Sequence, residues 1–354
     1  LGDKVKAQEI WKKIIESQIE TGVPYLLAKD SANRKTNQKN IGTIKSSNLC
    51  AEIMEVSDGD NYTAICTLSS LVLKNFLTTG KSFDFKALEA ATRKIVKALN
   101  KVIDINHYTT EKGKKGGLSQ RAIGIGVQGL ADVFLLMDYE FISPEAKELN
   151  KKIFETIYYA SISESMELVK NGLYQKYEFF EGSPYSKGEF QFNMWGLSED
   201  QLSGMFDWTQ LSKDVAMYGL CNSLFTAQMP VAGSAKITSS YEMTEPITSN
   251  LFSRRVTGGE FIISNPYLIY DLEDIGIWSE ELKTEILVNN GSIQNINFNK
   301  YLDAESKGYE KKVKRIEFLL KKYKTIWEIS QKELINMCAD RGAFIDQSQS
   351  MNIY

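Results

Sequence analysis

Three chemically different side chains occupy alternate positions in one short run near the amino-terminal end. In an extended segment, Asn48, Cys50 and Glu52 would all project to one side. The residues between them, together with Ile53, are apolar and would face the opposite side, where they could anchor the segment against a core. An amide, a thiol and a carboxylate on one supported edge form a reactive constellation.

The competing interpretation of Cys50 is purely structural. A free cysteine is among the most buried residue types and usually behaves as a small hydrophobe, and the spacing alone favours that interpretation. The rest of the sequence favours a reactive role for Cys50 instead, because Cys66 follows shortly and several distinctive segments occur further along the chain.

Taken together, these segments resemble the large, catalytic subunit of class I ribonucleotide reductase in its eukaryotic-like form. The resemblance runs nearly from end to end, and it depends on the order and spacing of the segments rather than on any single motif. The segments are the Asn-Leu-Cys-Ala-Glu run, residues 64–69, and residues 11–30, 123–132, 153–159, 229–234, 245–250, 254–256 and 340–350.

The resemblance implies a role for each side chain of the first constellation. The cysteine matching Cys50 would become a thiyl radical and abstract the hydrogen from the 3′ carbon of a ribose. The carboxylate matching Glu52 would act as base on the 3′ hydroxyl, and the amide matching Asn48 would hold the sugar hydroxyls. Cys66 resembles one member of the redox pair that supplies two electrons and becomes a disulfide.

The usual partner of that second cysteine lies in a part of the family that we expect to be absent here. Only Cys50, Cys221 and Cys338 remain as candidates, and nothing in the sequence shows that any of them comes within disulfide range of Cys66. The alternative for Cys66 is a buried thiol in a strand.

A second site is implied by a loop that resembles the phosphate-binding loop of the family. Backbone N–H groups at a turn leading into a helix would cradle the substrate diphosphate. Two positions depart from the pattern, because valine and glycine stand where hydroxyl residues are common, and Lys236 could add a compensating charge. The loop comprises Met229, Pro230, Val231, Ala232, Gly233 and Ser234.

Composition describes an ordinary globular chain. The 354 residues are 43% hydrophobic and 25% charged, and 42 basic residues nearly balance 45 acidic ones, so the net charge does not favour nucleic acid or an anionic membrane as a partner. Four scattered cysteines, and no signal-like or membrane-spanning stretch, predict a reducing, cytoplasmic location. With one histidine, His107, a multi-histidine metal site is excluded.

Hydrophobic spacing predicts the elements that position these residues. We expect helices over residues 5–19, after Asp84, from Pro144 to Asn171, and over residues 313–339 with a possible division at Thr325. Residues 63–73 are strand-like, and residues 29–47 are expected to form a loop. Residues 173–214 show no clear hydrophobic period, so we expect them to lie outside the main repeat of elements. This alternation predicts an α/β architecture in one continuous unit.

One glycine-rich motif matches a dinucleotide-binding pattern, but the neighbouring sequence does not support that function. Residues 124–129 fit the dinucleotide-binding pattern letter for letter, but the preceding residues are polar rather than strand-like, so the first structural element is lacking. We expect these glycines to permit the close approach of a helix. Residues 112–121 are expected to form a basic, solvated loop.

The family resemblance implies a specific fold for residues 1–354: the second half of a ten-stranded α/β barrel, with a finger loop at about residues 46–56. The first half and the C-terminal tail are expected to be absent, which would leave an exposed lumen able to associate with another chain. No cofactor is expected to bind directly; the family uses a metal-radical cofactor in a small subunit and ATP or dNTP effectors in the amino-terminal region.

The resulting hypothesis is a ribonucleoside-diphosphate reductase that requires completion by the missing segments. Its expected partners are the substrate, a small radical-generating subunit, the missing half in trans or in cis, and thioredoxin or glutaredoxin. The rival hypothesis is an inactive remnant that serves as a binding or regulatory partner. A third hypothesis is that the sequence is part of a complete subunit rather than a natural split protein.

Overall fold

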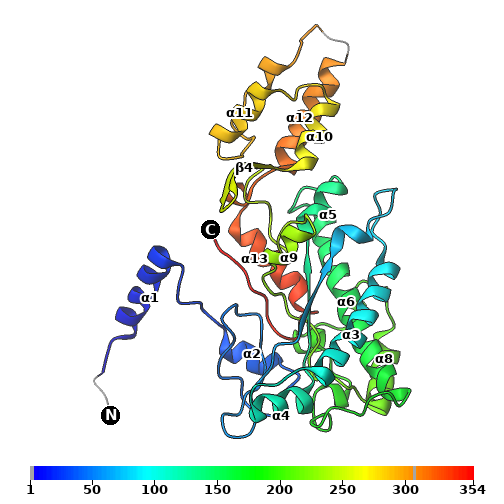
Figure 1. Cartoon of the computed structure of the whole chain (residues 1–354). Coiled ribbons are helices and arrows are strands. Elements are labelled where there is room, and N and C mark those ends of the chain that lie inside the picture. Colours follow the sequence, from blue (N-terminus) through cyan, green and yellow to red (C-terminus); the bar gives the residue numbers. More distant parts are fainter. Residues whose placement is uncertain (1–3, 306–307) are drawn as a thin grey trace.

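A computed structural model describes residues 4–305 and 308–354. The first part of the chain forms two helices, two short parallel strands and the long helices beside them (Figure 1). These elements are α1 Ala7–Thr21, α2 Lys29–Lys35, β1 Leu68–Val72, the 3-10 turn η1 Leu73–Phe76, α3 Phe85–Ile105, α4 Glu111–Gln120, β2 Gly124–Gln128, α5 Leu130–Leu136 and α6 Pro144–Lys170.

The second part is mostly helical and contains one antiparallel hairpin, β3–β4. Its elements are η2 Tyr185–Lys187, α7 Gln191–Met194, η3 Glu199–Gln201, α8 Trp208–Tyr218, α9 Ala232–Ile237, β3 Leu251–Val256, β4 Gly259–Ser264, α10 Pro266–Asp274, α11 Glu280–Val288, η4 Phe298–Tyr301, α12 Tyr309–Lys322, η5 Ile326–Glu328 and α13 Gln331–Gly342.

Four parallel segments form the centre of the chain. Strand β1 pairs with β2 in the register Leu68 to Gly124, and single parallel bridges then join Ile125 to Thr226 and Gln228 to Gln349. The order is therefore β1, β2, the segment before α9, and the C-terminal segment. A parallel array with helices between its members is the α/β arrangement that the sequence predicts, and it is consistent with part of a barrel.

The long helices begin where local sequence signals predict them. The Asp84 carboxylate accepts a hydrogen bond from the Ala87 N–H at the start of α3, and the Ser143 hydroxyl accepts one from Ala146 ahead of α6. Pro144 occupies the first turn of α6, where its missing N–H costs nothing. Helices α3 and α6 pack against each other, and α6 is buried along most of its length.

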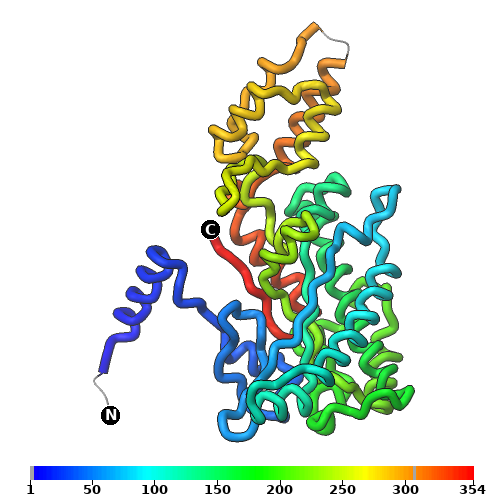
Figure 2. The backbone as a smooth tube through the Cα atoms, viewed as in Figure 1, coloured from blue at the N-terminus to red at the C-terminus, as the bar shows by residue number. Residues whose placement is uncertain are grey.

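Two regions project from this body. Hairpin β3–β4 and helices α10–α12 form a lobe at the top of Figure 1, and α1 stands apart from the other helices, as the tube in Figure 2 also shows. Helix α1 confirms the predicted first helix, but none of its residues is buried: Trp11 is 54% and Ile19 is 80% exposed. Its apolar side chains are therefore half-buried at most in the part of the chain that the structure describes.

Several sequence predictions need correction. Only Leu68–Val72 of residues 63–73 is a strand, residues 29–35 within the expected loop form α2, and the expected basic loop is helix α4. The division at Thr325 is confirmed, because α12 ends at Lys322 and η5 follows. Residues 173–214, expected outside the main repeat of elements, contribute the fully buried side chains of Tyr185 and Trp208 to the main core.

Of residues 4–305 and 308–354, none belongs to a helix that is both long and apolar enough to cross a lipid bilayer.

Candidate active site

The segment that carries Cys50 is a tight turn rather than an extended strand. The Ala51 N–H donates to the Asn48 carbonyl at 3.1 Å, and Ala51 has a φ of 69°, in the left-handed region. The Asn48 side-chain oxygen accepts from the Ile53 N–H at 3.2 Å and so closes the turn. The prediction of alternating sides is therefore wrong: Leu49 is 85% exposed at the tip instead of facing a core.

The turn separates the three reactive groups by depth. Asn48 and Cys50 are half-buried, whereas Glu52 is only 2% exposed, and one of its carboxylate oxygens, Oε2, lies buried without a hydrogen-bond partner. A buried polar atom without a partner costs free energy, so such an atom in a folded chain calls for an explanation. The Glu52 oxygen is available to an incoming group.

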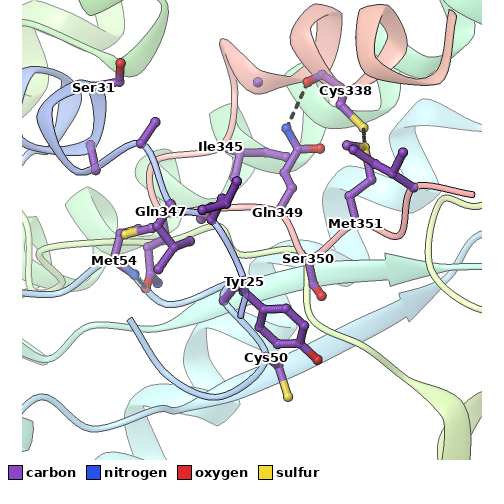
Figure 3. A pocket seen from close by; sticks show the side chains of 18 of the residues that line it. Tyr25, Ser31, Cys50, Met54, Cys338, Ile345, Gln347, Gln349, Ser350 and Met351 are labelled. Atoms are coloured by element: carbon purple, nitrogen blue, oxygen red, sulfur yellow. Dashed lines mark hydrogen bonds between the residues drawn. The ribbon is translucent and has the colours of Figure 1, made fainter. Parts of the chain in front are cut away.

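Cys50 lines a cavity of about 1160 Å³ between the amino-terminal segment and the C-terminal segment. Tyr25 and Cys50 both line this cavity. In Figure 3, Cys338 lies on the other side of the C-terminal segment from Cys50, and its sulfur is 3.1 Å from the sulfur of Met351. The cavity is large enough for a nucleotide-sized ligand.

The C-terminal segment holds the base of the turn. The Ser348 N–H donates to the Glu52 carbonyl at 2.9 Å, and the Met54 N–H donates to the Gln347 side-chain oxygen at 3.2 Å. The Gln347 side chain also donates to the Ile123 carbonyl just before β2, at 3.0 Å. The position of Glu52 therefore depends on residues almost 300 positions away in the sequence.

Cys66 lies two residues before β1 and is exposed, so the alternative of a buried strand thiol is wrong. Partial desolvation raises the pKa of its thiol to about 11, and the neighbouring charges of Glu55, Glu52 and Cys50 act in the same direction. Cys66 is thus electrostatically coupled to the constellation of the turn.

None of the four cysteines forms a disulfide in this structure. Cys221 is fully buried and exchanges a hydrogen bond with Ser165 at 3.3 Å, while Cys338 accepts from the Arg341 guanidinium at 2.8 Å. The structure therefore places neither of them as a partner of Cys66.

Sequence reasoning missed two buried acids beside the turn. Glu55 is 5% exposed, and burial, aided by the charge of Asp346 and opposed by the backbone N–H of Ile65, raises its pKa to about 8. Burial also raises the pKa of Asp346 to about 6, against hydrogen bonds from the Thr226 and Phe225 backbone and from the Tyr185 hydroxyl. A carboxylate inside an apolar run, Ile-Met-Glu-Val, was the signal for Glu55.

The loop of residues 229–234 leads directly into helix α9, as predicted. Met229 and Val231 are buried, and the following residues Ala232 and Gly233 are exposed. The Ser234 hydroxyl donates to the Gln128 side-chain oxygen at 3.1 Å. The first N–H groups of a helix have no partner within it, so they are the groups of this loop that a ligand could reach.

The glycines of residues 124–129 lie mostly inside strand β2 rather than in a strand-to-helix turn. A Cβ on Gly126 would stand 2.7 Å from the Ala227 carbonyl oxygen and 2.8 Å from the Met229 sulfur. These glycines permit the close approach of a neighbouring segment of backbone, so the prediction of a helix contact is wrong. The dinucleotide fingerprint needs its glycines after a strand, and this geometry does not provide that.

Comparison with known families decides the relationship. The family described as "Ribonucleotide reductase, barrel domain" matches residues 2–354. The chain belongs to this family. As a ribonucleotide reductase barrel domain, it has an α/β fold in which the parallel array described above forms part of the barrel.

Similar proteins agree with this assignment. The chain is 49% identical over 351 residues to the ribonucleoside-diphosphate reductase large subunit of Caenorhabditis elegans, and 48% identical to those of Danio rerio and Variola virus. These alignments cover 99% of the chain but only 41–42% of each relative, so the chain spans about two fifths of their length.

A solved structure gives the same result at lower identity. The alpha subunit of a class Id ribonucleotide reductase from Actinobacillus ureae superposes with a TM-score of 0.68 at 27% identity. The match covers 98% of this chain and 55% of that subunit.

Proposed function

We propose that this chain carries the catalytic centre for radical-based reduction of ribonucleoside diphosphates to 2′-deoxyribonucleoside diphosphates. The proposal rests on the family of the chain and on the printed names of its relatives, of which it spans about two fifths. The activity would belong to the barrel domain completed by further segments and by a small subunit.

The observation that supports the proposal most strongly is the environment of the Glu52 carboxylate. Its carboxylate is buried near a half-buried cysteine, and one oxygen has no hydrogen-bond partner. A chain that served only as a binding partner would gain nothing from holding such a group. A base that must take a proton from a substrate hydroxyl in a dry site needs this arrangement.

The reaction assigns one task to each side chain. A metal-radical cofactor of the small subunit would supply the oxidising equivalent that makes the Cys50 sulfur a radical. That sulfur takes the hydrogen atom from C3′ of the ribose, since an S–H bond is close in strength to the activated C–H bond. Glu52 accepts the proton of the 3′ hydroxyl, and the 2′ hydroxyl takes a proton from one of the two redox thiols and leaves as water.

Two further groups complete the cycle. Cys66 and a second thiol from a completing segment give up two electrons and two protons as they form a disulfide, and Cys50 returns its hydrogen atom to C3′. Asn48 contributes an amide that can both donate to and accept from a vicinal diol, provided that substrate binding releases it from the Ile53 N–H. Residues 229–234 would hold the diphosphate through backbone N–H groups, with Lys236 exposed nearby.

The finger loop is proposed to span residues 46–56, within a barrel half formed by residues 1–354. The regenerating reductant would be thioredoxin, glutaredoxin or a small dithiol. Effector nucleotides are proposed to bind outside this chain.

The test is reconstitution of the full-length protein with a radical-containing small subunit, a dithiol and a ribonucleoside diphosphate. Formation of deoxyribonucleoside diphosphate that disappears in Cys50→Ser supports the proposal. If no product forms although the small subunit still binds, the rival hypothesis of an inactive binding partner replaces it.

A further inference from the structure

Ser47, the half-buried residue before Asn48, joins the two arms of the turn. Its hydroxyl donates to the Ile53 carbonyl at 2.7 Å. Two longer bonds end on Asn48: its side-chain oxygen accepts from the Ile53 N–H at 3.2 Å, and its carbonyl accepts from the Ala51 N–H at 3.1 Å. The turn is thus closed through Ser47 as well as through Asn48.

The Ser47 hydroxyl has one hydrogen and two acceptors within reach. Its oxygen lies 2.7 Å from the Ile53 carbonyl oxygen and 3.3 Å from the Asn48 side-chain oxygen. The shorter distance is in the usual range for an O–H···O hydrogen bond and the longer one is outside it. Since a hydroxyl donates a single hydrogen, Ser47 bonds to the Ile53 carbonyl, and this bond does not depend on the side chain of Asn48.

The carboxyl-terminal arm of the turn provides a fixed base for this bond. The backbone groups of Glu52 and Met54, on either side of Ile53, are hydrogen-bonded to the C-terminal segment. Ala51 has a φ of 69°, a conformation that a residue with a Cβ keeps only when its surroundings impose it. The bond from Ser47 to Ile53 therefore ties the amino-terminal arm to a held position and helps to impose this conformation.

Substrate binding, under the proposed function, makes a second demand on Asn48. Its side-chain oxygen, which accepts from the Ile53 N–H, would have to accept from a hydroxyl of the ribose diol. The turn would then lose a closing bond at the moment when Cys50 and Glu52 must keep their positions.

We propose that Ser47 is a positioning residue that keeps the turn closed while Asn48 binds the ribose diol. The inference rests on the proposed function and deepens it, because it names the group that frees Asn48 for the substrate. The Ser47 hydroxyl holds the carbonyl of Ile53 and leaves the N–H of Ile53 able to separate from Asn48. In this role Ser47 acts through its neighbours rather than on the substrate.

The number of sugar hydroxyls distinguishes this role from a purely structural one. A ribonucleoside diphosphate presents 2′ and 3′ hydroxyls to Asn48, whereas the 2′-deoxy product presents the 3′ hydroxyl alone. If Ser47 frees Asn48, loss of its hydroxyl should weaken binding of the diol more than binding of the deoxy product. A bond that only stabilised the fold would affect both ligands equally.

The experiment measures the dissociation constants of CDP and 2′-deoxy-CDP for the full-length protein by equilibrium dialysis. The small subunit is left out, so that no turnover occurs. In Ser47→Ala, we expect CDP to bind about 5- to 10-fold more weakly, as loss of one hydrogen bond would give, and 2′-deoxy-CDP to change by less than about 2-fold.

Two variants serve as controls. Ser47→Thr keeps a hydroxyl and should restore the ratio of the two dissociation constants. Ser46→Ala is the matched control, because the exposed Ser46 hydroxyl donates to the Ser47 carbonyl at 3.2 Å and does not cross the turn. Its removal should leave both constants unchanged.

Equal weakening of both nucleotides in Ser47→Ala, or no change in either, would overturn the inference and leave the proposed function intact. An unchanged protein that bound neither nucleotide would overturn the proposed function itself. If Ser47→Ala does not fold, hydrogen exchange in the unchanged protein decides. CDP should speed exchange of the Ile53 N–H relative to 2′-deoxy-CDP while the Ala51 N–H stays protected, and an Ile53 N–H that exchanges no faster with CDP contradicts the inference.

Discussion

The turn of residues 48–53 and the loop of residues 229–234 differ in how the fold supports chemistry. At the turn, side chains with buried polar or ionisable groups are held by remote residues such as Ser348 and Gln347. At the loop, exposed backbone leads into a short helix, and Gly233 has open space around it. Substitution should therefore have severe effects at the turn and mild effects at the loop.

The most severe test of this contrast is Cys50→Ser. An alcohol O–H bond is too strong to take part in the reversible hydrogen transfer, so we expect deoxynucleotide formation to fall by about 10³-fold or more. The measurement is product formation in the reconstituted full-length protein. Cys338→Ser is the control, because it removes a thiol that lines the same cavity but has no proposed role. Equal losses in both variants would contradict a specific role for Cys50.

A second prediction concerns the stability of the turn. The folded chain retains the Glu55 proton up to a pKa of about 8, whereas the unfolded chain loses it near 4.5. The unfolded state therefore binds fewer protons in this window, and the free energy of unfolding falls as the pH rises through it. In the unchanged protein, this effect should lower the free energy of unfolding by an amount on the order of 2–5 kcal/mol. In Glu55→Gln, this decrease should be absent.

The measurement is the urea midpoint of both proteins at pH 5 and pH 8.5. The unchanged protein should lose more stability than Glu55→Gln between these values, and Asp346, with its pKa raised to about 6, contributes a smaller loss to both. Parallel changes in the two proteins would show that Glu55 does not carry an extra proton in the folded state.

A third prediction separates structural glycines from loop glycines. The Cβ of Gly126→Ala would meet backbone and side-chain atoms at 2.7–2.8 Å, so we expect destabilisation by about 1–3 kcal/mol. Gly233→Ala, with no atom within 4 Å of the new Cβ, is the matched control. Denaturation curves that rank the two variants in the opposite order would overturn this interpretation of the strand.

The smallest expected effect is at the loop itself. Gly233→Ser restores a hydroxyl where the family resemblance leads us to expect one. We expect a change in stability within about 0.5 kcal/mol and a decrease in the KM for ribonucleoside diphosphate of about 2- to 10-fold, as one added hydrogen bond to phosphate would give. If the KM does not change while kcat falls, residue 233 does not contact the diphosphate.

Local signals in the sequence predicted the helices well and the site less completely. The caps at Asp84 and Ser143 act within one turn, so the start of α3 and α6 could be inferred from neighbouring residues. The turn at Cys50 could not, because the positive φ of Ala51 is stabilised by Asn48 and by contacts with the C-terminal segment.

The same limit explains the two missed acids. Burial of Glu55 and Asp346 follows from packing between segments far apart in the sequence, and no local pattern shows that they lie near each other. Short parallel bridges at Thr226 and Gln349 escaped prediction for the same reason, since single bridges lack the alternation of a longer strand.

The most direct test of the central claim is the redox state of Cys66 after a single turnover. The full-length protein, with a small subunit and one ribonucleoside diphosphate but without an external dithiol, is quenched with iodoacetamide and analysed by peptide mass spectrometry. We predict that alkylation at Cys66 is lost in proportion to the deoxynucleotide formed. Product formation with Cys66 still fully alkylated would contradict the account.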